Sequence, residues 1–117
     1  MKLKGRVLLV DDDPIHRTVV GEVLKSQGYA CREAANGREA LDIARAQAPD
    51  LILTDLTMPV MNGWDLCAEL RRCEGLANIP VAVLSGVAWA VPAGVAALAK
   101  PVQLPELFAL LERLLGT

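Results

Sequence analysis

Five polar residues stand directly after short apolar runs and could combine in one chemical site: Asp11, Asp12, Asp55, Ser85 and Lys100. Three carboxylates held close together repel one another unless a cation or a shared proton relieves them. Mg²⁺ takes one or two protein carboxylates, keeps several waters and completes its shell with phosphate oxygens. The set therefore indicates a magnesium site beside a hydroxyl and an ammonium group.

A carboxylate beside Mg²⁺ and a lysine has the chemistry of a phosphoryl acceptor. The carboxylate attacks phosphorus, while the cation and the lysine neutralise charge on the oxygens that separate in the transition state. Positioning supplies most of such catalysis. The elements that place these residues therefore decide whether the site can exist.

Short β-rich runs alternate with longer segments of helical period, the pattern of a parallel sheet covered by helices. Strands are predicted at residues 7–10, 29–34, 51–54, 80–84 and 95–99. Helices are predicted from Pro14 until Gly28 ends the first one, and at 37–47, 63–72 and 104–115. Because parallel strands end at one rim, the five polar residues are expected to meet there.

The first predicted helix has Asp13 as its expected N-cap and Pro14 at its first helical position. Helical spacing lays one apolar stripe along it, which consists of Ile15, Val19, Val20, Val23 and Leu24. His16, one turn into this helix, is expected to be a solvated surface residue attracted by the nearby aspartates, and not a phosphohistidine.

Length and composition restrict the class of protein. A chain of 117 residues, 53% hydrophobic, has the size of a single domain, residues 1–117. Twelve basic and fourteen acidic residues, scattered along the chain, predict no direct binding to nucleic acid or to an anionic membrane. No apolar run reaches the roughly 18 to 20 residues of a membrane span. Three cysteines without a metal or disulfide spacing fit a reducing compartment, so a cytoplasmic protein without a leader is expected.

Four sequence blocks carry a specific resemblance. They are VLLVDDDP at 7–14, LTDLTMPVMNG at 53–63, LSG at 84–86 and KP at 100–101, in this order at four predicted strand ends. With them the chain resembles the receiver domain of two-component response regulators over essentially its whole length. The resemblance implies an α/β flavodoxin-like three-layer sandwich, whose five-stranded parallel sheet has the order 2-1-3-4-5 with helices on both faces.

The same resemblance implies a function and a metal site. Asp55 would accept a phosphoryl group from a sensor histidine kinase or a histidine phosphotransfer protein in a Mg²⁺-dependent reaction. Asp12 and Asp55 would ligate Mg²⁺ together with the backbone carbonyl of Thr57, and Asp11 would hold a metal-bound water. The protein would catalyse only its own phosphorylation and dephosphorylation, and would signal to a downstream protein that the sequence does not name.

Two further residues receive roles from the resemblance. Lys100 would pair with the phosphoryl group, and its peptide bond to Pro101 would be cis. The hydroxyl of Ser85 would turn inward to hydrogen-bond the phosphoryl group. The chain departs from the family between these two residues, where the connection is several residues short and the fourth helix is expected to be short or absent. Ala97 also replaces the usual switch aromatic, so phosphorylation is expected to survive with an altered signalling route.

Two other functions stay open on the sequence. A phosphorylation-independent, receiver-like scaffold for protein binding would fit the shortened connection. A haloacid-dehalogenase-like phosphohydrolase would use Asp11 as nucleophile and Asp13 as general acid, although no acidic pair follows Lys100 and the length leaves no room for a cap. The sequence also leaves open whether the receiver stands alone or is part of a larger regulator or hybrid kinase, and whether Trp64 and Trp89 are core or partner-binding residues.

Overall fold

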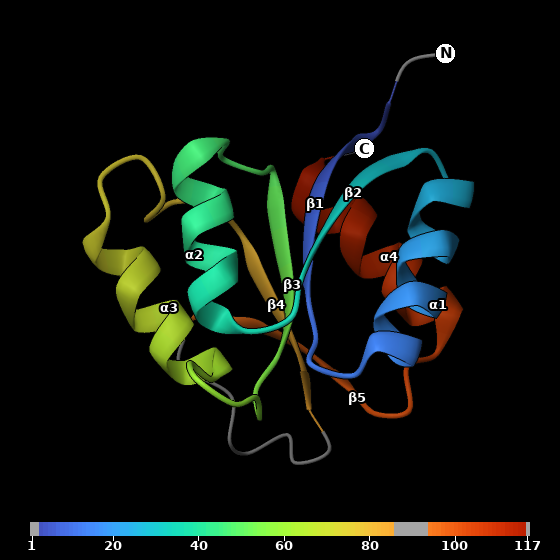
Figure 1. Ribbon diagram of the computed structural model, residues 1–117. Coiled ribbons are helices and arrows are strands. Elements are labelled where there is room, and N and C mark those ends of the chain that lie inside the picture. The colour runs from blue at the N-terminus through green and yellow to red at the C-terminus, as the bar shows by residue number, and fades with distance from the viewer. Residues whose placement is uncertain (1–2, 86–93, 117) are drawn as a thin grey trace.

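A computed structural model describes residues 3–85 and 94–116 of the chain. These residues form a five-stranded sheet with two helices on each face (Figure 1). The strands are β1 (Gly5–Val10), β2 (Tyr29–Ala34), β3 (Leu51–Asp55), β4 (Val81–Ser85) and β5 (Ala96–Ala99). The helices are α1 (Pro14–Ser26), α2 (Gly37–Ala46), α3 (Gly63–Arg72) and α4 (Leu104–Leu115).

The sheet is parallel throughout, with the strand order β2-β1-β3-β4-β5. Val10 of β1 is in register with Thr54 of β3, and Asp55 is in register with Leu84 of β4. The residues that end β1, β3 and β4 therefore emerge at one rim, at the lower edge of the sheet in Figure 1. The predicted flavodoxin-like fold and its strand order are confirmed.

The central strands are buried on both faces, as their continuous apolar runs predict. In β1, Val7 and Leu9 face the layer of α1 and α4, whereas Leu8 and Val10 face the layer of α2 and α3. All four side chains are at most 1% exposed. At roughly 1.5–3 kcal/mol for each fully buried aliphatic side chain, this packing fixes the sheet on which the rim residues stand.

Three helices begin with a side-chain cap at the rim. The carboxylate of Asp13 accepts the Ile15 N–H at 3.0 Å, and Asn36 and Asn62 accept the N–H groups of Glu39 and Asp65, both at 2.9 Å. Each cap satisfies a donor that the first turn of a helix leaves unpaired. The caps thus fix where each loop of the rim turns into its helix.

The expected apolar stripe of α1 is only partly buried. Val20 and Leu24 pack into the core, but Ile15 is 76% exposed and Val19 is 57% exposed. The stripe is wider than the contact that one helix makes with a sheet, so its outer edge remains on the surface.

The connection between β4 and β5 is ten residues long. The expected short or absent fourth helix concerns residues 86–93, which lie outside the described residues, as does Trp89. Among the described residues, no helix is both long and apolar enough to cross a membrane.

Candidate functional site

The rim brings three carboxylates together. Asp11, Asp12 and Asp55 each offer an oxygen, and these oxygens lie within 4.8 Å of one another. Asp11 and Asp55 are 1% and 3% exposed, whereas Asp12 is exposed to solvent. Together with Thr57 and Lys100 they line a cavity of about 600 Å³ between α1 and the β5–α4 loop. Ser85 is buried at the end of β4 and is not among the described residues that line this cavity.

The carbonyls of Asp55 and of the next residue, Leu56, each accept a hydrogen bond. The Thr54 hydroxyl donates to the Asp55 carbonyl at 2.8 Å, and the Gly63 N–H donates to the carbonyl of Leu56 at 2.8 Å. A Cβ at position 63 would lie 2.5 Å from the Asp55 carbonyl oxygen, too close for any real side chain. The start of α3 therefore packs directly on the backbone that presents the Asp55 carboxylate.

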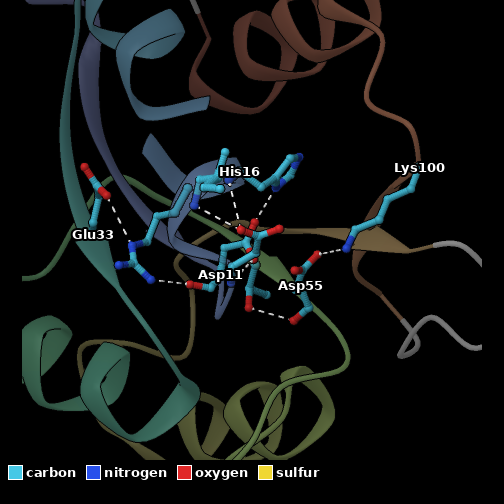
Figure 2. A network of polar contacts seen from close by, with 9 residues as sticks. Asp11, His16, Glu33, Asp55 and Lys100 are labelled. Carbon is cyan, nitrogen blue, oxygen red and sulfur yellow. Dashed lines mark hydrogen bonds and ion pairs between the residues drawn. The ribbon is translucent and has the colours of Figure 1, made fainter. Parts of the chain in front are cut away.

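Lys100 supplies positive charge to the site and lies on the side of Asp55 that is away from Asp11 (Figure 2). Its Nζ lies 2.6 Å from Oδ1 of Asp55, and its backbone N–H donates to the Ser85 carbonyl at 3.0 Å. The peptide bond to Pro101 is cis, as the family resemblance implies. Oδ1 of Asp55 is buried, and the ion pair with Lys100 is the contact that balances its charge.

Asp11 is held much more completely than Asp55. Its N–H donates to the Ala34 carbonyl at 3.0 Å, and its Oδ1 accepts the Asp13 N–H at 2.9 Å. His16 contacts Oδ2 through Nδ1, and Arg17 donates from Nη1 to the Asp11 carbonyl at 2.7 Å. Figure 2 shows this network, in which Arg17 also pairs with Glu33 at 3.2 Å. Both carboxylate oxygens of Asp11 thus have protein partners.

The two buried carboxylates shift in opposite directions. Burial raises the pKa of Asp55 to about 6, with Lys100 opposing the rise and Asp11 adding to it. Burial also acts to raise the pKa of Asp11, but hydrogen bonds from His16 and from the Asp13 N–H outweigh it and hold that pKa below its ordinary value. Asp11 is therefore stabilised as a carboxylate by the protein, whereas Asp55 lacks part of the positive environment that its charge requires.

This arrangement fits a hard divalent cation. Oxygen ligands, one buried carboxylate oxygen without a hydrogen bond and one exposed carboxylate match the partial, water-rich coordination of Mg²⁺. The predicted gathering of Asp11, Asp12, Asp55 and Lys100 is confirmed as geometry, while the individual role of each residue stays a prediction.

Sequence reasoning expected His16 to be a solvated surface residue attracted by the nearby aspartates, and it missed the contacts of Arg17. The attraction of His16 is confirmed, since its side chain contacts Asp11, although at 34% exposure it is only partly solvated. Arg17 joins the Asp11 carbonyl to Glu33. The sequence contained a signal for these contacts. With Asp13 as the N-cap, side chains in the first turn of α1 lean toward the N-terminal end of the helix, where Asp11 lies.

The sequence matches the family model of the response regulator receiver domain over residues 7–112. The chain belongs to this family. Receivers act in two-component signalling and are not enzymes in the ordinary sense. The acidic group of this receiver is consistent with Mg²⁺-dependent phosphorylation of an aspartate.

Relatives and solved structures agree with this assignment. A gliding motility regulatory protein of Myxococcus xanthus is 43% identical over 83 residues, which are 71% of this chain and 11% of that protein. The sensor histidine kinase RcsC of Salmonella typhimurium is 39% identical over 66 residues, 56% of this chain and 7% of the kinase. The chain spans 11% to 36% of the length of the first curated relatives that it matches.

A solved relative provides a direct parallel for the acidic site. The receiver domain of a sensor histidine kinase from Pseudomonas aeruginosa PAO1 is 33% identical, with a TM-score of 0.89 that covers 97% of this chain and 98% of that one. That structure has a magnesium ion coordinated in its active-site cleft. The present chain has a matching group of three carboxylates at its rim.

Proposed function

We propose that Asp55 of this receiver is phosphorylated, in the presence of Mg²⁺, by a sensor histidine kinase or a histidine phosphotransfer protein. The observation that carries the proposal is the position of the Asp55 carboxylate, whose buried Oδ1 faces the Lys100 ammonium at 2.6 Å and lies beside the carboxylates of Asp11 and Asp12. An ammonium at this distance can neutralise the oxygens of a phosphoryl group that Asp55 accepts. The receiver membership of the chain supports the same assignment.

The hydrolase alternative, in which Asp11 is the nucleophile, is disfavoured by the contacts of Asp11. Its two carboxylate oxygens already have partners in Asp13 and His16. These contacts stabilise the charge of Asp11 and so lower its reactivity as a nucleophile. Asp55 instead faces the Lys100 ammonium, which can neutralise a phosphoryl group bound to Asp55.

In the proposed reaction an oxygen of Asp55 forms a bond to phosphorus while the bond from phosphorus to the donor imidazole nitrogen breaks. The electron pair of that bond stays on the departing imidazole. Lys100 lies where it can neutralise charge on the phosphoryl oxygens, and we assign the Ser85 hydroxyl to hydrogen-bond the bound phosphoryl group. Mg²⁺, when bound, would supply the remaining charge neutralisation.

We assign the cation to Asp12 and Asp55 as direct ligands, with the backbone carbonyl of Thr57 as the third protein ligand and Asp11 holding a metal-bound water. Asp12 is exposed and Thr57 lines the same cavity, so both are accessible to a hydrated cation. This leaves room for the several waters that Mg²⁺ retains.

We infer that the phosphoryl donor docks on the apolar surface around the cavity. Val19 and Leu104 line the cavity and are 57% and 43% exposed, and Ile15 extends the surface along α1. An exposed apolar surface beside a phosphoryl-transfer site suits a partner that must bind transiently and bring a histidine within reach. The proposed kinase partner and the three cysteines without a disulfide spacing support a cytoplasmic location, which we include in the proposal.

We further propose that residues 1–117 form one receiver unit, whether it acts alone or within a longer protein.

The test is phosphorylation by acetyl phosphate and Mg²⁺, followed by intact mass measurement. The wild type should gain one phosphoryl group, and Asp55→Asn should gain none. Asp13→Asn is the matched control, because it removes a neighbouring carboxylate while asparagine still caps α1. A gain that persists in Asp55→Asn and is lost in Asp11→Asn would refute the proposal in favour of the hydrolase alternative.

A further inference from the structure

His16 makes a contact that the proposed phosphorylation does not itself require. Its Nδ1 lies against Oδ2 of Asp11, on the side of that carboxylate away from the Asp13 N–H, which is bound to Oδ1. His16 is the one histidine of the sequence, and its side chain is 34% exposed at the edge of the cavity. The contact joins a surface-accessible ring to a nearly inaccessible carboxylate.

The backbone at the start of α1 fixes the position from which the His16 side chain extends. The His16 N–H donates to the Asp13 cap at 3.3 Å, and Pro14 occupies the first helical position. Side chains in a first turn lean toward the N-terminal end of their helix, which here is the loop that contains Asp11. The contact is therefore built into the start of α1.

An ionised carboxylate can only accept hydrogen bonds, so Nδ1 of His16 must donate to Asp11. With Asp13 bound to Oδ1 and His16 bound to Oδ2, the carboxylate is held at both oxygens and cannot rotate freely. Its neighbours Asp12 and Asp55 carry like charges within 4.8 Å. Without the second contact, repulsion from these neighbours would favour turning the carboxylate away from them.

We propose that His16 is a positioning residue of the cation site, which holds the Asp11 carboxylate toward Asp12 and Asp55 and thereby strengthens binding of a divalent cation. This inference rests on the proposed function, because it assumes that the cation binds at this group. Carboxylates at metal sites commonly need such a second partner, and its loss typically weakens metal binding by about 10- to 100-fold.

The test is calorimetric titration with Mg²⁺ of the wild type, His16→Leu, His16→Asn and Thr18→Leu. His16→Leu should bind Mg²⁺ at least about tenfold more weakly. His16→Asn should retain most of the affinity, because its Nδ2 can donate from nearly the same position as Nδ1. Thr18→Leu, at an exposed position of the same helix, should bind like the wild type. His16→Ala is measured alongside, so that a folding defect caused by leucine does not decide the result.

A spectroscopic signature separates positioning from mere structural support. Because the chain has one histidine, the ring nitrogens of uniformly ¹⁵N-labelled protein give one unambiguous set of signals. Nδ1 should be the protonated nitrogen in the metal-free protein and should remain so at saturating Mg²⁺. Release of that hydrogen bond by Mg²⁺ would overturn the inference, because His16 would then compete with the cation.

The outcomes also distinguish the two proposals. Equal Mg²⁺ affinity of the wild type, His16→Leu and His16→Ala overturns the role of His16 and leaves the proposed function intact. Tighter binding by the leucine and alanine variants overturns it as well. A wild type that binds no Mg²⁺, or binds it as well as Asp12→Asn does, overturns the cation site on which the inference depends.

Discussion

Asp11 and Asp55 show how partners, more than burial, determine the chemistry of a carboxylate. Both are nearly inaccessible, at 1% and 3% exposure, and their oxygens lie within 4.8 Å of each other. Asp11 accepts hydrogen bonds at both oxygens, which hold its pKa below the ordinary value, whereas burial raises the pKa of Asp55 although Lys100 forms an ion pair with its Oδ1. The less stabilised carboxylate is the one proposed to react.

Asp55→Asn is expected to stabilise the metal-free protein at neutral pH. Burial raises the pKa of Asp55 to about 6 in the folded state, above its ordinary value of 3.8, so the folded state binds the proton more tightly. Stability from this group is fully present below pH 3.8 and is lost as the pH rises through about 6. The variant should thus gain on the order of 1–3 kcal/mol over the wild type at pH 7.5 and almost nothing near pH 4.

Urea unfolding in the presence of a metal chelator, measured from pH 4 to pH 7.5, gives the free energy of unfolding of the wild type and of Asp55→Asn. Asp42→Asn is the control, since Asp42 is well exposed on α2 and should show no comparable gain. A difference between Asp55→Asn and wild type that does not change with pH would contradict the raised pKa of Asp55.

At the scale of the elements, the strands and helices follow closely from the sequence. Continuous apolar runs end at polar residues, and capping residues mark the helix starts, so β2, α3 and α4 have the predicted bounds. The exposure of Ile15 and Val19 on α1 was not predictable. Helical spacing tells which way a side chain points, but not whether the neighbouring elements extend far enough to cover it. The contact of Arg17 with the Asp11 carbonyl was not predicted either, and for His16 the sequence indicated attraction to the aspartates without the choice of Asp11, because both contacts depend on side-chain conformations across a turn.

The altered signalling route stays a prediction at this scale. Ala97 lies exposed in β5, at the edge of the sheet, and a methyl group cannot take the place of a moving aromatic ring. The remainder of that route concerns residues 86–93, outside the described part of the chain.

Gly63→Ala is expected to damage both stability and the site. The new Cβ would lie 2.5 Å from the Asp55 carbonyl oxygen and 2.8 Å from Cα of Leu56, so backbone must move. Overpacking of this kind costs about 1–3 kcal/mol. Because the displaced backbone presents Asp55, the rate of phosphorylation by acetyl phosphate should fall as well.

Gly21→Ala is the matched control for that substitution. Gly21 is also buried in a helix, but the nearest atom to a new Cβ is Oε2 of the Glu33 side chain, at 3.2 Å, which can move. Alanine also favours helix over glycine by up to about 1 kcal/mol. Urea unfolding should therefore show a change within about 1 kcal/mol for Gly21→Ala. Equal losses in both variants would show that close approach to the Asp55 backbone is not the cause.

Ile15→Asp tests the proposed donor surface on α1. Ile15 is 76% exposed, and an aspartate near a helix N-terminus is compatible with folding. A charge placed in an apolar contact should slow phosphotransfer from a histidine phosphotransfer protein by at least about tenfold, while phosphorylation by acetyl phosphate stays unchanged. The readout is the rate of transfer from a radiolabelled donor that phosphorylates the wild type.

Leu3→Asp serves as its control, because Leu3 is 58% exposed and precedes β1, at the opposite end of the sheet from the rim. If Leu3→Asp slowed transfer as much as Ile15→Asp, the donor surface would not lie on α1.

At the scale of the whole molecule, the rim joins segments that are far apart in the chain. Asp11 and Asp12 follow β1, Asp55 ends β3, and Lys100 follows β5, so residues up to 89 positions apart meet in one cavity. Their like charges oppose the closure of the rim, and the single ammonium of Lys100 offsets only part of that repulsion. A bound cation would therefore stabilise the fold as a whole and not only the site.

Mg²⁺ is accordingly expected to raise the thermal midpoint of unfolding. At a concentration of 100 times its dissociation constant, a ligand that binds only the folded state adds about 2.7 kcal/mol, or about 10 °C for a chain of this size. Differential scanning calorimetry at pH 7.5 should show this shift for the wild type and Asp13→Asn, and lose most of it in Asp12→Asn. Because protons compete for Asp55, whose pKa is about 6 without metal, the shift should shrink as the pH falls below that value. If the shift were the same in Asp12→Asn, or constant down to pH 4.5, Mg²⁺ would stabilise the protein through some other surface. The three carboxylates of the rim would then have to be held together by shared protons alone.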